Sequence, residues 1–230
     1  MEQILIIGAS GHAKVIVDII ERQNHYKIHG FLDTYKKKGN YLFDYPILGP
    51  EDDINTIVEQ HNIMGCFVAI GDNCTRKKMV AKIAALNPKL PFINAIHPHS
   101  TIGKNVELGR GIAIMPGVVI NSDSKIGDFC ILNTNSSLGH DGTMKNYSSI
   151  SSGVRTGGNL LLEENSAISI GATIIENIII GKDTIIGAGS LVTKNIPDHV
   201  VAYGGPAKVV RSRNPNDKYL FGEKNKTTDR

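Results

Sequence analysis

The segment Ile126-Gly-Asp-Phe-Cys-Ile-Leu-Asn-Thr-Asn-Ser-Ser-Leu-Gly-His-Asp-Gly-Thr-Met144 carries an aliphatic residue or methionine at every sixth position. The same spacing extends outward in both directions, from Ile102 to Val192, and fifteen of its sixteen positions are aliphatic or methionine. A chain that is 41% hydrophobic would give about six or seven by chance, and neither a helix nor an ordinary strand has a period of six. Strict six-residue spacing therefore predicts a parallel β-helix.

Each hexapeptide of this pattern is expected to form one short strand and one corner, with the aliphatic anchor pointing into a triangular prism. Glycine often follows the anchor, and a small or aliphatic residue often stands four positions after it. Three hexapeptides make one coil, so residues 102–191 supply five coils of 18 residues that stack as parallel strands on one core. We assign residues 97–212 to this domain and residues 213–230 to a polar tail.

The first 96 residues are expected to form a small Rossmann-like α/β domain, which makes the fold class mixed. Apolar strands, glycine turns and amphipathic helices recur there. The expected strands are 4–7, 28–32, 66–70 and 91–96, the expected helices are 11–22, 54–61 and 75–86, and residues 34–46 are expected to be a loop.

A glycine turn, Gly8-Ala-Ser-Gly-His12, separates the first strand from the first helix. It lacks the full dinucleotide fingerprint, so NAD is not predicted. Free N–H groups at a helix N-terminus still favour a phosphate. Asp33, 25 residues after Gly8, could accept hydrogen bonds from a ribose or a base.

Composition narrows the function classes. A net charge of +3 argues against nucleic acid as the main partner. Three scattered cysteines indicate free thiols in a reducing compartment, and no cluster has metal-ligand spacing. No apolar run approaches the roughly 18–20 residues of a membrane span, and no signal peptide is present, so we expect a cytoplasmic protein without a metal or membrane partner.

His140 is the strongest catalytic candidate because it is the only histidine within the repeats. The wall of an apolar prism has no packing need for imidazole, and a histidine titrates near neutral pH. Asp141 follows it directly. Thr156 breaks the aliphatic register, and Gly157-Gly158 after it would let a ligand approach closely.

The repeats, together with Tyr203-Gly-Gly-Pro-Ala-Lys208, resemble the hexapeptide-repeat acyltransferases, which have a left-handed β-helix. The Gly-Ala-Ser-Gly-His turn and the segment Ile70-Gly-Asp-Asn73 with Arg76 narrow the resemblance to one subgroup. It contains bacterial N-acetyltransferases of nucleotide-linked amino sugars and the similar sialic acid O-acetyltransferases. The resemblance implies acetyl-CoA as co-substrate and a homotrimer with active sites between subunits.

The resemblance also implies roles for single residues. His140 would be the general base, Asp141 would orient it, and Asn133 would position substrate or the same network. Acetyl-CoA would contact Gly158, which would face the thioester, and then Ile168, Gly171, Ala188, Gly205, Pro206 and Lys208. The nucleotide sugar would contact Gly8, Ser10, Gly11, His12, Asp33, Thr34, Tyr35, Gly71, Asn73 and Arg76.

The function implied is direct acetyl transfer, in a ternary complex, to a UDP- or dTDP-linked 4-amino-4,6-dideoxy sugar of bacterial surface glycans. O-acetylation of sialic acid or a related sugar is the main alternative. A scaffold with a lost active site is disfavoured by His140 and Asp141, and a nucleotidyltransferase by the short N-terminal domain. The sugar, the base, the accepting atom, the acyl length and the role of the tail stay open.

Overall fold

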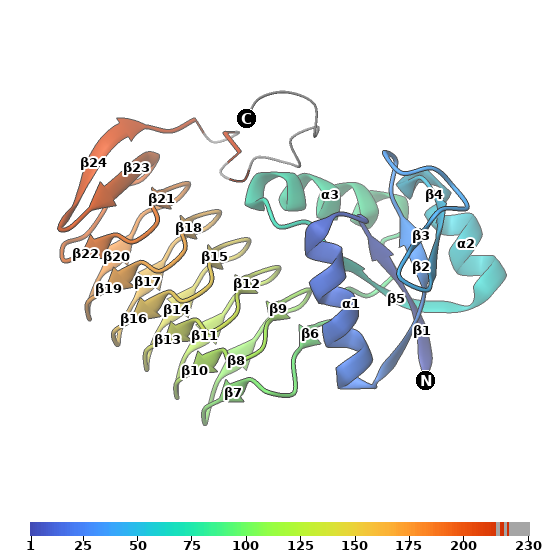
Figure 1. Ribbon diagram of the computed structural model, residues 1–230, viewed down its shortest axis with the longest axis horizontal. Helices are drawn as coiled ribbons and strands as arrows, with labels where there is room; N and C mark the ends of the chain where they lie inside the picture. The colour runs from blue at the N-terminus through green and yellow to red at the C-terminus, as the bar shows by residue number, and fades with distance from the viewer. Residues whose placement is uncertain (215–216, 219, 221–230) are drawn as a thin grey trace.

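The N-terminal half is a mixed five-stranded sheet flanked by helices (Figure 1). The computed structural model describes residues 1–214, 217, 218 and 220. The elements in chain order are β1 (Glu2–Ile7), α1 (Gly11–Gln23), β2 (Tyr26–Leu32), β3 (Tyr41–Leu42), β4 (Tyr45–Gly49), the 3₁₀ turn η1 (Glu51–Asp53), α2 (Ile54–His61), β5 (Ile63–Val68) and α3 (Asn73–Leu86). The strand order is β3-β4-β2-β1-β5, and β1 runs parallel to both β2 and β5.

Two expectations for this half are wrong. The segment 34–46 is not wholly a loop, because β3 pairs antiparallel with β4 as a short hairpin. The strand expected at 91–96 is reduced to an isolated bridge between Phe92 and Cys66 and to the two-residue strand β6 (Ala95–Ile96). Strand β6 pairs with the β-helix rather than with the N-terminal sheet. The expected division at residue 96 stays a prediction.

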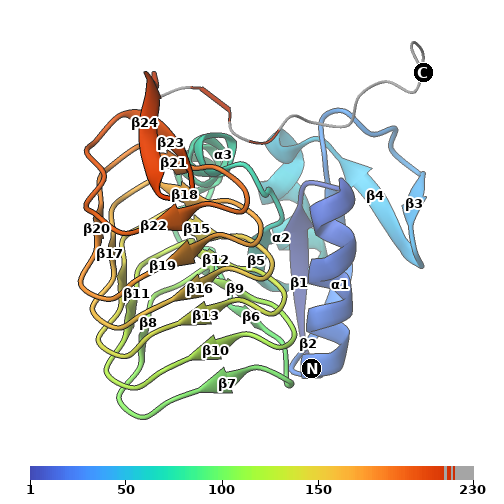
Figure 2. The same ribbon diagram turned by 60° about the vertical axis from the view of Figure 1, so that its left-hand side comes forward.

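The second half confirms the left-handed β-helix, which is a triangular prism of three sheets whose strands are parallel except for the last, β24 (Figures 1 and 2). Face 1 contains β6, β9 (Ala113–Ile114), β12 (Ile131–Leu132), β15 (Ser149–Ile150), β18 (Ala167–Ile168), β21 (Ile185–Ile186), β23 (Val200–Gly204) and β24 (Ala207–Ser212). Face 2 contains β7 (Thr101–Ile102), β10 (Val119–Ile120), β13 (Ser137–Leu138), β16 (Arg155–Thr156), β19 (Thr173–Ile174) and β22 (Leu191–Val192). Face 3 contains β8 (Glu107–Leu108), β11 (Lys125–Ile126), β14 (Thr143–Met144), β17 (Leu161–Leu162) and β20 (Ile179–Ile180).

The anchors of the six-residue pattern are the second residues of β7 to β22, and they form the core of the prism. Inner anchors such as Leu138, Ile150 and Ile180 are fully buried, whereas Ile102 in the first coil is 39% exposed because no coil covers it. At the other end, β23 pairs with β21 and turns back as β24. The repeat therefore builds one continuous core with an open first coil.

Three corners join the faces, and the third residue of nearly every corner has a positive φ. Corner 1–2, between face 1 and face 2, has glycine at four of these positions: Gly117, Gly153, Gly171 and Gly189. Corner 2–3 has Asn105, Asp123, Asp141, Asn159 and Asn177 there, and corner 3–1 has Gly111, Phe129, Tyr147, Asn165, Asp183 and His199. Glycine, asparagine and aspartate are the residues that tolerate this conformation best. The corners therefore carry different side chains while sharing one backbone shape.

None of the helices among the described residues is long and apolar enough to cross a membrane.

Candidate functional site

His140 and Asp141 form a hydrogen-bonded pair on corner 2–3. The imidazole Nδ1 lies 2.7 Å from Asp141 Oδ2, and both side chains are more than half exposed. Because a carboxylate can only accept, Nδ1 donates its proton, and the neutral ring then has its lone pair on Nε2. Asp141 stands at the positive-φ position of the corner, where aspartate is tolerated, and its N–H donates to Ser122 O at 3.1 Å. The expected contact between these two residues is present.

Gly158 lies one coil further along the prism than His140, directly against its ring. A Cβ at position 158 would come within 2.5 Å of His140 Cε1 and 2.6 Å of Nε2. Only glycine therefore leaves room for the imidazole in this position. Within the described part of the chain, the Gly158 N–H donates to no acceptor.

A hydrogen bond explains why Thr156 stands at the one anchor position that is not aliphatic or methionine. Its Oγ1 accepts a hydrogen bond of 3.0 Å from the Gly139 N–H, the residue before His140. The side chain thus fixes the backbone that carries the catalytic candidate. The break in the aliphatic register is visible in the sequence, but the role of this hydroxyl is visible only in the structure.

A second group of predicted residues lines a cavity of about 260 Å³ between corner 1–2 and the N-terminal domain. His12, Gly71 and Asn133 lie in its wall, together with Ile131, Ser149, Ile150, Ser151, Ser152, Ile170 and Leu220. Ser151 and Ser152 were missed, although they stand 18 residues after Asn133 and Thr134 and so occupy the next coil of the same corner. The 18-residue spacing of the coils is enough to predict that these two serines lie beside Asn133 and Thr134.

His12 brings an unsatisfied nitrogen to this cavity. Its Nε2 is buried and has no hydrogen-bond partner among the described residues. Burial, reinforced by the nearby Arg76 charge, lowers the pKa of His12 to about 4. The ring is therefore neutral near pH 7, and its free nitrogen suits a ligand polar group.

Asn133 does not lie with His140 within one chain. It follows β12 on corner 1–2, whereas His140 follows β13 on corner 2–3. Asn133 Oδ1 accepts from the Thr134 N–H at 2.9 Å, which holds the amide at its own corner. The two residues are separated by the width of face 2.

Several residues expected to contact acetyl-CoA do share corner 1–2. Gly171 stands on this corner with open space where a Cβ would be, and Ala188 follows one coil later. The Ile170 and Ala188 N–H groups donate to no acceptor among the described residues. The β23–β24 turn with Gly205 and Pro206 closes the same end, and Lys208 pairs with Tyr203 across that hairpin.

The side chain of Ile168 is fully buried as an inward anchor of β18, like that of Ile150, whose residue lines the His12 cavity. The expected contact of Ile168 with acetyl-CoA would therefore be made by its backbone, and it stays a prediction.

The turn after β1 is held by Asp33. Its Oδ2 accepts from the Ala9 N–H at 2.7 Å and its Oδ1 accepts from the Tyr35 N–H at 2.8 Å. Gly8 has a φ of +94°. Ser10 is the N-cap of α1, but its side chain makes no capping bond. Asp33 therefore shapes the glycine turn, and the Ser10 hydroxyl at the start of α1 is not used by the helix.

The residues after Asp33 have different surroundings. Thr34 is tied to the buried Glu51 carboxylate by its hydroxyl and, at 3.3 Å, by its N–H. Tyr35 is 94% exposed, which leaves its ring free for a partner. Gly11 is exposed in the first turn of α1.

The side chains of Arg76 and Asn73 join the two domains. Arg76 is 1% exposed, and it donates to the carbonyl oxygens of Ile70, Gly71, Phe129 and Tyr147 at 2.7–3.2 Å. It also donates to Asn73 Oδ1, while Asn73 Nδ2 donates to Ser166 O at 3.1 Å. Both side chains are engaged in the domain interface, and their contact with the nucleotide sugar stays a prediction.

No group of three or more histidine, cysteine, aspartate or glutamate side chains within the described residues could hold a metal ion.

Comparison with known proteins places this architecture among sugar acetyltransferases. Residues 3–83 match the PglD N-terminal domain family. UDP-N-acetylbacillosamine N-acetyltransferase of Bacillus subtilis is 31% identical over 115 residues, which are 50% of this chain and 52% of that protein. The match thus spans about half the length of this curated relative.

Solved structures match over nearly the whole chain. Perosamine N-acetyltransferase from Caulobacter crescentus, as a histidine mutant in complex with CoA and GDP-perosamine, gives a TM-score of 0.87 at 32% identity. That match covers 92% of this chain and 98% of the other. The acetyltransferase domain of PglB from Neisseria gonorrhoeae, in complex with acetyl coenzyme A, gives a TM-score of 0.84 at 28% identity, with 91% and 99% covered. The chain belongs to the hexapeptide-repeat sugar N-acetyltransferases.

Proposed function

We propose that this protein is an acetyl-CoA-dependent N-acetyltransferase of a nucleotide-linked 4-amino-4,6-dideoxy sugar in bacterial surface glycan synthesis. The observation that carries the proposal is the His140–Asp141 pair, which leaves a basic nitrogen at the surface of the prism. UDP and dTDP are the carriers expected from the sequence. The GDP-perosamine bound by one relative adds GDP to the carriers to be tested.

His140 is the general base in this proposal. Nε2 takes a proton from the sugar amine as the amine attacks the acyl carbon, and the Asp141 carboxylate stabilises the resulting imidazolium. Acetyl-CoA supplies the acyl group as a thioester. Its carbon–sulfur bond breaks as the amide bond forms, and CoA leaves as a thiol after taking the proton from the His140 imidazolium. The Gly158 N–H, which has no acceptor among the described residues, is available to the thioester oxygen as negative charge develops on it.

The N-terminal domain holds the nucleotide in this proposal. The N-terminus of α1, with Gly8, Ser10 and Gly11, offers N–H groups and the positive end of a helix dipole to the diphosphate. His12 meets the sugar or phosphate with its unpaired Nε2. Asp33, Thr34 and Tyr35 form the wall nearest the base, where the exposed Tyr35 ring offers a stacking surface.

Acetyl-CoA extends along corner 1–2 in this proposal. Gly171 and the N–H groups of Ile170 and Ala188 leave the backbone open to the amides of the pantetheine arm. Gly205, Pro206 and the Lys208 ammonium stand at the end of this path, where CoA phosphates would be met.

We infer a homotrimer whose active sites lie between subunits. Corner 1–2 carries the His12 cavity, and corner 2–3 carries His140, so one chain alone does not bring them together. Packing the corners of neighbouring prisms against each other would join the two halves. Val119 and Leu191 on the intervening face 2 are 37% and 40% exposed, as expected of a surface that is covered on assembly.

Substitution of His140 tests the mechanism. His140→Ala is expected to lower kcat by about 10²–10⁴, the usual effect of losing a general base, without loss of folded protein. His25→Ala removes an exposed histidine of the N-terminal domain and serves as the matched control. A His140→Ala enzyme with a kcat close to that of the wild type would refute the assignment. If sialic acid is the only acceptor that is acetylated, the accepting group is a hydroxyl and not an amine.

A further inference from the structure

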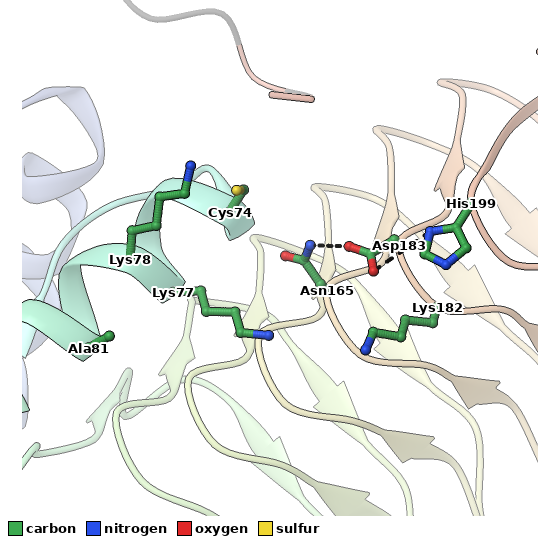
Figure 3. A pocket seen from close by; sticks show the side chains of 8 residues that line it. All are labelled: Cys74, Lys77, Lys78, Ala81, Asn165, Lys182, Asp183 and His199. Carbon is green, nitrogen blue, oxygen red and sulfur yellow. Dashed lines mark hydrogen bonds and ion pairs between the residues drawn. The ribbon is translucent and has the colours of Figure 1, made fainter. Parts of the chain in front are cut away.

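A second cavity, larger than the His12 cavity, shares no lining residue with it. It has a volume of about 500 Å³ and is enclosed by α3 on one side and corner 3–1 on the other (Figure 3). Its lining residues are Cys74, Lys77, Lys78, Ala81, Asn165, Lys182, Asp183 and His199, none of which lines the His12 cavity. The reaction proposed above uses none of them.

The repeat geometry and the helix periodicity both explain this lining. Asn165, Asp183 and His199 are successive positive-φ residues of corner 3–1, so their side chains stack along the prism edge. The α3 residues are spaced i, i+3, i+4 and i+7, which places them on one face of the helix. The cavity begins where the aromatic corner residues Phe129 and Tyr147 give way to the polar ones.

Cationic groups outnumber anionic ones around this cavity. Glu164 is shared by Lys77 at 2.5 Å and Lys182 at 3.8 Å. Lys78 makes no ion pair with any described residue. The Asp183 carboxylate lies 3.8 Å from the buried guanidinium of Arg213, which offsets its charge. An anionic group entering the cavity would therefore meet lysine ammonium groups that lack a full set of counter-charges.

Asn165 provides a second, independent sign of a ligand. It is 5% exposed, and its Nδ2 donates to Asp183 Oδ1, which fixes the orientation of the amide. Its Oδ1 is buried without a partner among the described residues, and Figure 3 shows it turned away from Asp183 towards the α3 side of the cavity. A buried acceptor without a donor costs free energy, and a ligand hydroxyl would remove that cost.

We propose that this cavity is a second binding site, separate from the reaction site, for a phosphorylated sugar. The phosphate contacts Lys77, Lys78 and Lys182, and a sugar hydroxyl donates to Asn165 Oδ1. A simple anion satisfies only the lysines, and an unphosphorylated sugar satisfies only Asn165. The cavity volume lies in the range of small-molecule sites.

Titration calorimetry of the full chain tests the proposal, with glucose 1-phosphate, inorganic phosphate and glucose as probes. Glucose 1-phosphate is expected to bind more tightly than phosphate, and glucose to show no binding at ~10 mM. The double variant Lys77→Ala/Lys182→Ala is expected to weaken the binding of glucose 1-phosphate by about tenfold or more, because charge-assisted contacts to the phosphate are lost. Asn165→Gly, which keeps the positive φ, is expected to reduce the affinity for glucose 1-phosphate to that for phosphate.

Matched controls separate this site from general charge effects. Lys104→Ala/Lys125→Ala removes two exposed lysines elsewhere on the prism and is expected to leave all affinities unchanged. Thermal unfolding checks that each variant is folded, and Lys78→Ala, which breaks no ion pair among the described residues, probes the site if the double variant is unstable. Failure of glucose 1-phosphate to bind at ~10 mM overturns the proposal. The proposal is also overturned if all cavity variants bind glucose 1-phosphate as tightly as the wild type does, or if acetyl-CoA competes with glucose 1-phosphate for binding.

Discussion

Gly158→Ala probes whether the position of His140 is what catalysis depends on. The added Cβ would lie 2.5 Å from His140 Cε1 and 2.6 Å from Nε2. Ordinary carbon contacts are about 3.5 Å, so the ring must move by about 1 Å. A misplacement of about 1 Å can cost about 10²-fold in rate, which is about 2.7 kcal/mol of transition-state stabilisation. Gly158 has no positive φ, so alanine introduces no backbone strain of its own.

The assay is a double-mutant cycle on kcat, followed by release of the CoA thiol. Gly158→Ala alone is expected to lose about 10²-fold in kcat, while Gly158→Ala in a His140→Ala background should lose little more. The His140→Ala substitution removes the ring and leaves space for the new Cβ, so the two losses cannot add. Additive losses, or a Gly158→Ala enzyme with nearly normal kcat, would show that Gly158 does not act through His140.

Other predictions test the pair, the interface, the buried histidine and the assembly. Asp141→Asn is expected to lower kcat by about 10² or more with little change in KM, because the amide cannot stabilise the imidazolium; steady-state kinetics check this. Arg76→Ala should reduce the free energy of unfolding by about 3–5 kcal/mol in urea titrations, whereas the exposed Arg22→Ala should cost less than about 1 kcal/mol. His12 is neutral when folded, with a pKa of about 4, but is protonated below about 6.5 when unfolded. Its contribution to stability should therefore be lost as pH falls from about 6.5 towards 4, and His12→Gln should flatten that part of the stability profile. Sedimentation should give a trimer at working concentration, and an active monomer would contradict the shared site.

The six-residue period predicts the β-helix well because each anchor must be buried at every coil. The inward positions of Leu138, Ile150 and Ile180 all follow from it. The same period predicts that the Ile168 side chain points inward, so the expected contact with acetyl-CoA would have to be made by the backbone of this residue. The β3–β4 hairpin escaped prediction because its strands are short and tyrosine-rich, without the alternation that marks a longer strand.

The candidate site was less predictable than the fold. The His140–Asp141 contact could be anticipated because the residues are adjacent and share one corner. Asn133 is seven residues earlier, and a shift of one hexapeptide moves a residue to another corner. Arg76 belongs to the motif that indicates the family, but a motif does not tell whether a side chain points to ligand or to the other domain.

The most direct test of the account is thiol release from acetyl-CoA against a panel of acceptors. The panel contains UDP-, dTDP- and GDP-linked 4-amino sugars, a 3-amino sugar, and free and CMP-linked sialic acid. We expect turnover on a nucleotide-linked 4-amino sugar, and we expect the His140→Ala substitution to abolish it. Turnover on sialic acid alone, or turnover that survives the loss of His140, would contradict it.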